Sequence, residues 1–203
     1  MAETINKWIC VIDTETTGLP EMYKDFKMKK YYPPRQTEKY DKSRIVQVTA
    51  LFFNTHTQEK VILDEIIKPT YDFIIDNDEF HGITQQRAEE EGIYPNQFFE
   101  KLKKKFNEMN TVLIVGHNIW FDVFILQSEM YRIYETMALR NIFYKIPKFC
   151  TMVKSKHLNG NKNPKLDLLY SKLFNEERIE EHKHNSLYDT EDTLRCYLKL
   201  VNP

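Results

Sequence analysis

The stretch ICVIDTETTGLP, residues 9–20, decides both the fold and the chemistry that we expect from this chain. Its first four residues are apolar and mostly β-branched, which predicts a buried central strand whose far end carries polar groups. Asp13 and Glu15 stand two residues apart at that end. Because side chains alternate between the faces of a strand, both carboxylates project to one side and Thr14 projects to the other. Two such carboxylates can bind the same hard cation, although the pair also fits an ordinary exposed strand end.

A third acidic residue, Asp122, lies in the apolar stretch GHNIWFDVFIL, residues 116–126. It falls in the first turn of a predicted helix, where the helix dipole by itself favours a carboxylate. The apolar neighbours make an unsolvated charge costly there unless it is paired or bound to a metal. The stretch therefore also fits a cation ligand, with His117 and Asn118 in the turn before it.

The third segment, HNSLYD at residues 184–189, places His184 five residues before Asp189 at the start of the last predicted helix. Asp189 can bind a metal from the helix while His184 stands on the turn before it. Histidine is the side chain that ordinarily exchanges protons near neutral pH, so it can take a proton from a metal-bound water. Four carboxylates and one histidine are the groups that two-metal phosphodiester hydrolysis requires. Carboxylate oxygens favour Mg²⁺ or Mn²⁺ over zinc.

The remaining hydrophobic patterns indicate an α/β fold. β-rich runs at residues 44–53 and 60–67 flank a short polar stretch and predict an antiparallel hairpin. Apolar residues at helical spacing between Pro95 and Met109 predict an amphipathic helix that covers a sheet. Further predicted elements are strands at 111–115 and 149–152 and helices at 120–134, 166–174 and from Ser186, whose hydroxyl can cap the helix. This order predicts a mixed β-sheet that contains the antiparallel hairpin and is flanked by helices.

Residues 21–42 have no sustained periodicity and contain Pro33-Pro34, so we expect a long loop inserted after the first strand. The loop mixes aromatic and basic residues, the combination that stacks bases and neutralises phosphates in single-stranded nucleic-acid binding. Its aromatic residues are Tyr23, Phe26, Tyr31 and Tyr32, and its basic residues are Lys24, Lys27, Lys29, Lys30 and Arg35. A solvated loop whose aromatic rings pack on the domain is an equally good explanation.

The size and composition of the chain fit one compact domain over residues 1–203. Its 203 residues and 41% hydrophobic content suffice for a core without a disulfide. The 3 cysteines have no metal-binding spacing, so we expect buried free thiols in a reducing compartment, cytoplasmic or nuclear. We find no signal-peptide pattern and no apolar run of membrane-spanning length, and therefore expect a soluble intracellular protein without membrane association. The net charge of −1 neither supports nor excludes a nucleic-acid partner.

Three motifs together resemble the DnaQ-like 3′–5′ exonucleases of the DEDDh subgroup, within the ribonuclease H-like superfamily. The motifs are DTETTGLP at 13–20, HNIWFD at 117–122 and HNSLYD at 184–189, with the histidine five residues before the last aspartate as in that subgroup. IVQVTAL at 45–51, FHGIT at 80–84 and the segment around Cys150 also match family positions. The resemblance covers nearly the whole chain. Residues 21–42 depart from it because they are longer than in the minimal family members.

The resemblance implies a role for each motif. Metal ligands would be Asp13, Glu15, Asp122 and Asp189, and His184 would be the general base. The cofactors would be two divalent cations, Mg²⁺ with Mn²⁺ able to substitute. In our hypothesis one cation is held by Asp13, Glu15 and Asp189 and the other chiefly by Asp13. The terminal nucleotide would contact Thr16, Thr17, Gly18, Leu19, His81 and Asn118, with Leu19 as an apolar wedge against the base.

The activity that the resemblance implies is 3′–5′ exonuclease hydrolysis of single-stranded or frayed DNA, with release of nucleoside 5′-monophosphates. The same chemistry serves DNA repair and polymerase proofreading, and proofreading would need a separate polymerase chain as partner. An RNA 3′–5′ exonuclease of the same fold is the first alternative, although DTETTGLP is closer to DNA-acting members. A non-catalytic nucleic-acid-binding or polymerase-accessory module is the second alternative. Such a module would be expected to lack a ligand or the histidine, and this chain keeps all of them. The oligomeric state stays open.

Overall fold

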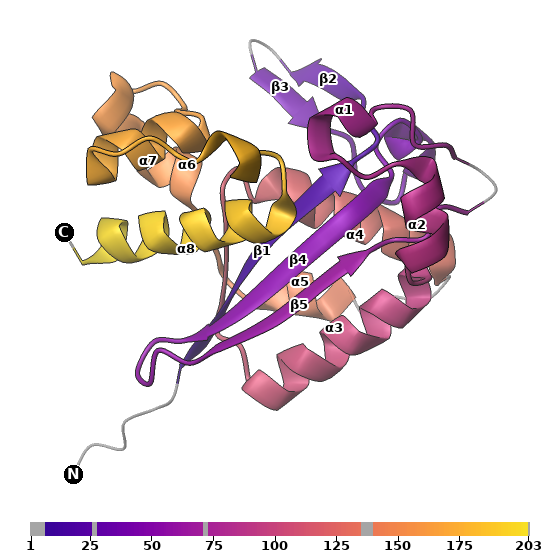
Figure 1. Cartoon of the computed structure of the whole chain (residues 1–203), viewed down its shortest axis with the longest axis horizontal. Helices are drawn as coiled ribbons and strands as arrows, with labels where there is room; N and C mark the ends of the chain where they lie inside the picture. The colour runs from indigo at the N-terminus through magenta and orange to yellow at the C-terminus, as the bar shows by residue number, and fades with distance from the viewer. Residues whose placement is uncertain (1–6, 26–27, 71–72, 135–139, 203) are drawn as a thin grey trace.

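The computed structural model describes residues 7–25, 28–70, 73–134 and 140–202. Its centre is a five-stranded sheet with the strand order β5-β4-β1-β6-β7 (Figure 1). The strands are β1 (Trp8–Thr16), β4 (Ile45–Asn54), β5 (Lys60–Ile66), β6 (Leu113–Gly116) and β7 (Lys148–Cys150). β1 pairs antiparallel with β4 and parallel with β6, and β4 and β5 form an antiparallel hairpin. The mixed sheet predicted from the sequence is confirmed.

Helices cover both faces of this sheet (Figure 1). One face carries α3 (Pro95–Met109), α4 (Trp120–Ile133) and α5 (Arg140–Lys145), and the other carries α8 (Ser186–Val201) with α6 (Thr151–Lys154) and α7 (Leu166–Phe174) beside it. The four helices predicted from the sequence are present with small shifts of their ends. The strand predicted at 149–152 is wrong in its second half, because the chain turns into α6 at Thr151.

β1 lies in the middle of the sheet because its apolar half is buried on both faces. Cys10 and Ile12 belong to a core formed with α3 and α4, and Ile9 and Val11 belong to a second core formed with α8. None of these four residues is more than 2% exposed. Side chains that alternate along a strand thus divide between the two helical layers. Side chains at the polar end of β1 alternate in the same way. This alternation decides whether each of them faces the helices on one side of the sheet or those on the other.

The segment 21–42 contains more structure than the loop that the sequence predicts. Two short strands, β2 (Met22–Asp25) and β3 (Met28–Tyr31), pair antiparallel, and a short 3-10 helix (Thr37–Tyr40) follows. Strands of four residues are too short to produce a readable alternation in the sequence, which is why this segment resembles a loop. Phe26 and Lys27 lie outside the described residues, and so does the Lys29 side chain.

The aromatic residues of this insertion divide between the domain and the solvent. The Tyr31 ring packs against Phe124 of α4, with ring centroids 5.6 Å apart. The Tyr32 ring lies 4.9 Å from that of Tyr23. Tyr31 and Tyr32 are partly buried, whereas Tyr23 is exposed. Packing on the domain therefore accounts for Tyr31 and Tyr32. Among the described tyrosines of the insertion, Tyr23 is the most exposed to solvent.

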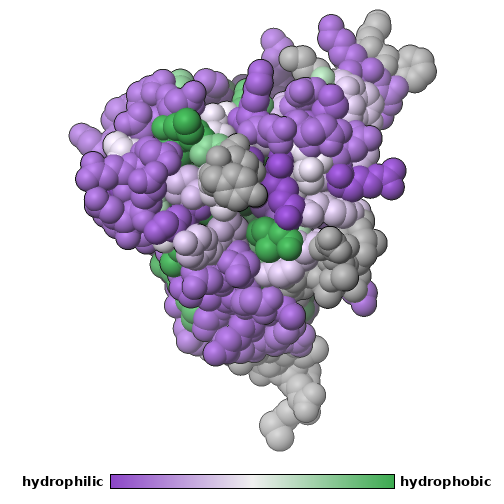
Figure 2. Space-filling view, turned by 90° about the vertical axis from the view of Figure 1, so that its right-hand side faces the viewer, coloured by the Kyte–Doolittle hydropathy of each residue, from purple (hydrophilic) through white to green (hydrophobic). Residues whose placement is uncertain are grey.

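The surface beside the insertion is mainly hydrophilic. α1 (Asp78–His81) and α2 (Gln85–Glu91) lie on a face where hydrophobic areas are small and separate (Figure 2). Within the described ranges, no helix combines the length and the apolar character needed to cross a membrane. The cysteines, Cys10, Cys150 and Cys196, are buried free thiols, as expected.

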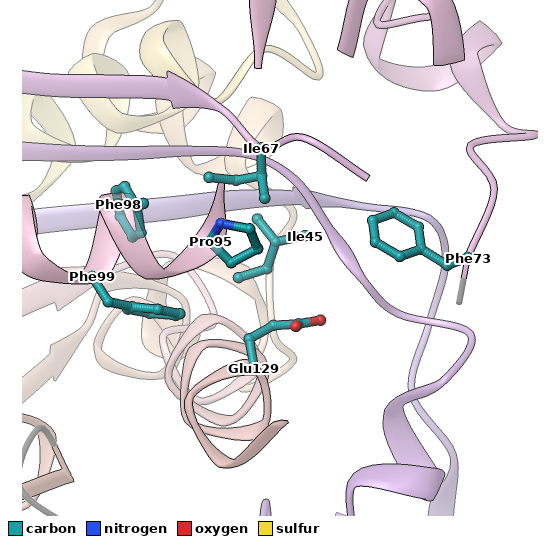
Figure 3. A pocket seen from close by; sticks show the side chains of 7 residues that line it. All are labelled: Ile45, Ile67, Phe73, Pro95, Phe98, Phe99 and Glu129. Atoms are coloured by element: carbon teal, nitrogen blue, oxygen red, sulfur yellow. The ribbon is translucent and has the colours of Figure 1, made fainter. Parts of the chain in front are cut away.

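A buried ion pair joins the start of β4 to α4. The Arg44 guanidinium donates to the Glu129 carboxylate through Nε (2.5 Å) and Nη2 (3.3 Å), and both side chains are 5% exposed. The guanidinium also lies over the Phe73 ring, 4.4 Å from its centroid. Glu129 borders a small apolar pocket with Phe73, Pro95 and residues of β4 and α3 (Figure 3). A charged pair in such surroundings holds α4 at a defined distance from the sheet.

We expect Glu129→Ala to lower the free energy of unfolding by about 3–5 kcal/mol, because the variant leaves a buried positive charge without this carboxylate. Urea unfolding measures the loss. The matched control is Glu91→Ala, which removes an exposed ion pair with Arg87 and should cost no more than about 0.5 kcal/mol. A loss below about 1 kcal/mol for Glu129→Ala would contradict a structural role for the buried pair.

Candidate active site

Three of the predicted metal ligands meet at the polar end of β1. Asp13 and Glu15 lie on the face of the sheet that α8 covers, and Asp189 comes from the first turn of α8. One carboxylate oxygen of each residue lies within 4.8 Å of the other two, and all three residues are partly buried. The structure thus places the two carboxylates of β1 on one side, as the spacing in the sequence predicts.

The start of α8 is fixed to the sheet by hydrogen-bonding groups. The Asn185 side chain caps the helix by accepting a hydrogen bond from a backbone N–H of the first turn (3.1 Å). The Ser186 hydroxyl, which we expected to be the cap, instead lies 2.7 Å from the buried hydroxyl of Thr49. Thr49 is the residue of β4 that lies opposite Asp13 in the antiparallel register. This contact places α8, and therefore Asp189, level with Asp13 along the sheet.

Asp122 reaches β1 from the side of α4. Its Oδ1 accepts hydrogen bonds from the backbone N–H (3.0 Å) and the hydroxyl (2.9 Å) of Thr14. Among the described residues, the carboxylate oxygens that gather within 4.8 Å belong to the other three predicted ligands and do not include Asp122. Burial raises the pKa of Asp122 to about 8, although the hydrogen bonds from Thr14 oppose that rise. Asp122 is therefore joined to the acidic cluster through Thr14.

The crowded carboxylates shift one another's protonation. Burial raises the pKa of Asp13 well above its ordinary value, and the charges of Asp122, Asp189 and Glu15 raise it further. Burial also raises the pKa of Glu15 to about 7, with a smaller contribution from Asp189. A bound cation would remove this mutual repulsion. Oxygen ligands of this kind fit a hard divalent cation such as Mg²⁺ or Mn²⁺.

His184 stands on the turn directly before α8. Its backbone is in the left-handed region, with a φ of 57°, and its side chain is exposed. Burial raises the pKa of Asp189, and Arg178 first and His184 after it oppose that rise. The imidazole is therefore close to a predicted ligand and accessible to water. Both properties fit the role of a general base.

Arg178 is a residue of this site that the sequence analysis missed. It lies in the connection before the 3-10 helix Glu180–His182, and only 3% of its side chain is exposed. The guanidinium donates to Asp189 through Nη2, to Asp192 through Nε (2.7 Å) and to Asp167 through Nη1 (2.7 Å). The available signal was a single arginine in an acidic stretch just before the third motif, which by itself also fits a solvated segment.

The loop after β1 is held in place by the chain that enters β4. The backbone N–H of Thr17 donates to the Arg44 carbonyl (2.9 Å), and the Arg44 N–H donates to the Thr17 hydroxyl (3.0 Å). The Thr16 hydroxyl donates to the Gly18 carbonyl (2.7 Å). A Cβ on Gly18 would lie 2.8 Å from the Lys42 carbonyl oxygen, so the fold itself requires glycine there. Leu19 is 78% exposed, which leaves its side chain available for a ligand.

The two remaining predicted substrate residues are engaged within the protein. His81 is buried, and its Nδ1 accepts the Ile83 backbone N–H (3.2 Å) while its Nε2 lies 3.3 Å from Asn77 Oδ1. The Asn77 side-chain amide donates to the Thr16 carbonyl (3.0 Å), so His81 supports the end of β1 indirectly. Asn118 has a φ of 65° and hydrogen-bonds Tyr31 of the insertion.

His117, the first residue of the second motif, is engaged in contacts with other segments of the fold. Burial lowers its pKa to about 4, which keeps the imidazole neutral at physiological pH. Its Nδ1 lies 2.9 Å from the Thr151 hydroxyl and its Nε2 lies 3.1 Å from the Pro164 carbonyl. His117 therefore links the turn before α4 to the start of α6 and to the loop that precedes α7.

Comparison with solved structures shows which proteins share this fold. The zinc-bound complex of E. coli exonuclease I with single-stranded DNA matches with a TM-score of 0.67, 17% identity, and coverage of 97% of this chain and 40% of that chain. The complex of E. coli exonuclease I with a dT13 oligonucleotide matches with a TM-score of 0.68, 18% identity, and coverage of 97% and 41%. Exonuclease I from Methylocaldum szegediense matches with a TM-score of 0.67, 19% identity, and coverage of 97% and 40%. The chain thus spans about 40% of the length of these proteins.

Sequence comparison gives the family. No curated protein matches the chain closely. The family model RNase_T, described as an exonuclease family, matches residues 10–197, a range that contains all three motifs. The family resemblance and the ribonuclease H-like α/β fold predicted from the sequence are confirmed. The chain therefore belongs to the exonuclease family that this model describes.

Proposed function

We propose that this chain is a metal-dependent 3′–5′ exonuclease that acts as a single domain over residues 1–203. It would hydrolyse phosphodiester bonds at the 3′ ends of single-stranded or frayed DNA and release nucleoside 5′-monophosphates. The observation that carries the proposal is the convergence of Asp13, Glu15 and Asp189 at the end of β1, in a chain of the exonuclease family.

The acidic residues would hold the cofactor. Asp13, Glu15 and Asp189 would bind a divalent cation directly, and Asp122 would contribute from the side of α4. Two bound cations would stabilise the charge that develops on the attacking and leaving oxygens. We propose Mg²⁺, with Mn²⁺ as a substitute, because all four groups are carboxylates. The zinc-bound form of E. coli exonuclease I supports a metal site in this fold.

The polar groups around the cluster would orient the substrate and move the proton. His184, exposed beside Asp189, would accept the proton of the attacking water. The loop from Thr16 to Leu19 would contact the terminal nucleotide, with the exposed Leu19 side chain against the base. Asn118, partly buried beside Tyr31, would contact the nucleotide from the turn before α4, and His81 would act through Asn77. Tyr23 and Lys24, both exposed on β2, would meet the strand farther from its end.

DNA is the proposed polymer because oligonucleotide complexes of E. coli exonuclease I share this fold. An RNA exonuclease would use the same carboxylates, so it stays the alternative. The retention of all four carboxylates and of His184 favours an enzyme over a non-catalytic accessory module. Proofreading beside a separate polymerase chain, or DNA repair in a reducing compartment, would be the setting for this activity.

The central test is the substitution Asp13→Asn. We expect it to lower mononucleotide release to below about one thousandth of wild type, because the carboxylate contributes several kcal/mol of transition-state stabilisation through the cation. Release from DNA labelled at its 3′ end is measured with Mg²⁺, with Mn²⁺ and with EDTA. Glu108→Gln, which loses exposed ion pairs with Lys104 and Lys105 at the end of α3, is the control and should retain full activity.

The same assay identifies the polymer. Parallel rates on single-stranded DNA, duplex DNA and RNA should be highest for single-stranded DNA. A faster rate on RNA would replace the DNA proposal by the RNA alternative. A wild type that binds the strand with both cations present but releases no mononucleotide would support the accessory module instead.

The raised pKa of Glu15 predicts how the metal-free protein responds to pH. The folded value, about 7, lies above the ordinary 4.5, so the folded state holds this proton more tightly than the unfolded state. The resulting stability is fully present below pH 4.5 and is lost as the pH rises to about 7. In EDTA, Glu15→Gln should therefore raise the free energy of unfolding at pH 7 by on the order of 2 kcal/mol.

Urea unfolding between pH 4.5 and pH 7 measures this effect. Added Mg²⁺ should stabilise the wild type more than Glu15→Gln, since only the wild type keeps the full ligand set. The same pH dependence in both proteins would refute the idea that burial and the charge of Asp189 disfavour the ionised form of Glu15.

For the base, we expect His184→Ala to lower kcat by roughly 10²–10⁴-fold, because a positioned base contributes about that factor. The pH–rate profile should change near neutral pH, while Mn²⁺ affinity, measured by calorimetry, should stay close to wild type. His157→Ala, on the polar stretch before α7, is the control. An unaltered pH–rate profile for His184→Ala would remove His184 from the reaction.

A further inference from the structure

Arg178 connects the acidic cluster to two carboxylates that take no part in it. Asp167 lies on α7, and Asp192 lies on α8 one turn after Asp189. All three carboxylates accept hydrogen bonds from the one guanidinium. Arg178 is 3% exposed in its side chain, so this charge is held in the interior and not at a solvated rim.

The third contact of the guanidinium is the informative one. Asp192 and Asp167 already supply two opposite charges to Arg178, at 2.7 Å each, which is enough to compensate a buried positive charge. The remaining nitrogen donates to Asp189, one of the three residues whose oxygens gather at the end of β1. An arginine with five donors in a rigid plane can fix a carboxylate in orientation, and a flexible ammonium group cannot do so equally well.

We propose that Arg178 is a positioning residue of the metal site, which holds the Asp189 carboxylate in place and offsets part of the negative charge around Asp13. The inference rests on the proposed function, because it assigns Asp189 to the metal. Arg178 would act through Asp189 and would not touch substrate. Asp167 and Asp192 would keep the guanidinium in position from the far side.

The substitution Arg178→Lys separates orientation from charge. Lysine keeps the positive charge but lacks the planar set of donors, so Asp189 loses its fixed orientation. We expect Mn²⁺ affinity, measured by calorimetry with manganese chloride alone, to fall by about 10-fold or more. In the exonuclease assay kcat should fall, while KM for single-stranded DNA should change little.

A second variant keeps the test informative if Arg178→Lys fails to fold. The double substitution Asp167→Asn with Asp192→Asn leaves Arg178 in place and weakens its anchoring, so Mn²⁺ affinity should fall in the same direction by a smaller factor. The matched control is Glu191→Gln, also on α8. It loses an exposed ion pair with Lys60 of β5 and should bind Mn²⁺ like the wild type.

Folded Arg178→Lys with wild-type Mn²⁺ affinity would overturn the proposal, even if its melting temperature were lower, since Arg178 would then be purely structural. An unchanged affinity in the double variant, with Arg178→Lys unfolded, would overturn it as well. A wild type that binds Mn²⁺ but releases no mononucleotide would refute the proposed function alone. The manganese titrations would then still decide the role of Arg178.

Discussion

The alternation of side chains along β1 is the constraint on which the rest of the site depends. A strand can direct two carboxylates to one face only if the residue between them goes to the other face, and Thr14 takes that position. Asp13 and Glu15 therefore meet α8 and its Asp189, while Thr14 meets α4 and donates two hydrogen bonds to Asp122. Because β1 lies in the middle of the sheet, its polar end meets predicted ligands from both helical layers.

A fold that gathers like charges needs other interactions to hold its elements together. Two buried arginines provide them at different places. Arg44 ties the start of β4 to Glu129 of α4, and its backbone holds the loop after β1. Arg178 joins α7 to α8 through carboxylates on both helices. These ion pairs hold the helices in place around the sheet. The fold therefore tolerates the repulsion among the predicted ligand carboxylates, which a bound cation would relieve.

Several features could be predicted from the sequence because they are local in origin. Hydrophobic periodicity predicts the mixed sheet and its main helices, and the spacing of Asp13 and Glu15 predicts their shared face. The insertion at 21–42 could not be predicted as a hairpin, since strands of four residues carry too little pattern. The helix cap went to Asn185 and not to Ser186, because the Ser186 hydroxyl is used by Thr49, a residue that is distant along the chain.

By itself, the sequence determined the family, the α/β fold and the identity of the five residues proposed for catalysis, since these follow from order and spacing along the chain. Only the tertiary structure decided how those residues are held. It showed that Thr14 donates hydrogen bonds to Asp122 and that Arg178 donates one to Asp189. It also showed that the nearby Lys42 carbonyl leaves no room for a side chain at Gly18. The physical reason is that a buried hydrogen bond or close contact depends on which distant segments pack together, and no periodicity within one segment carries that information.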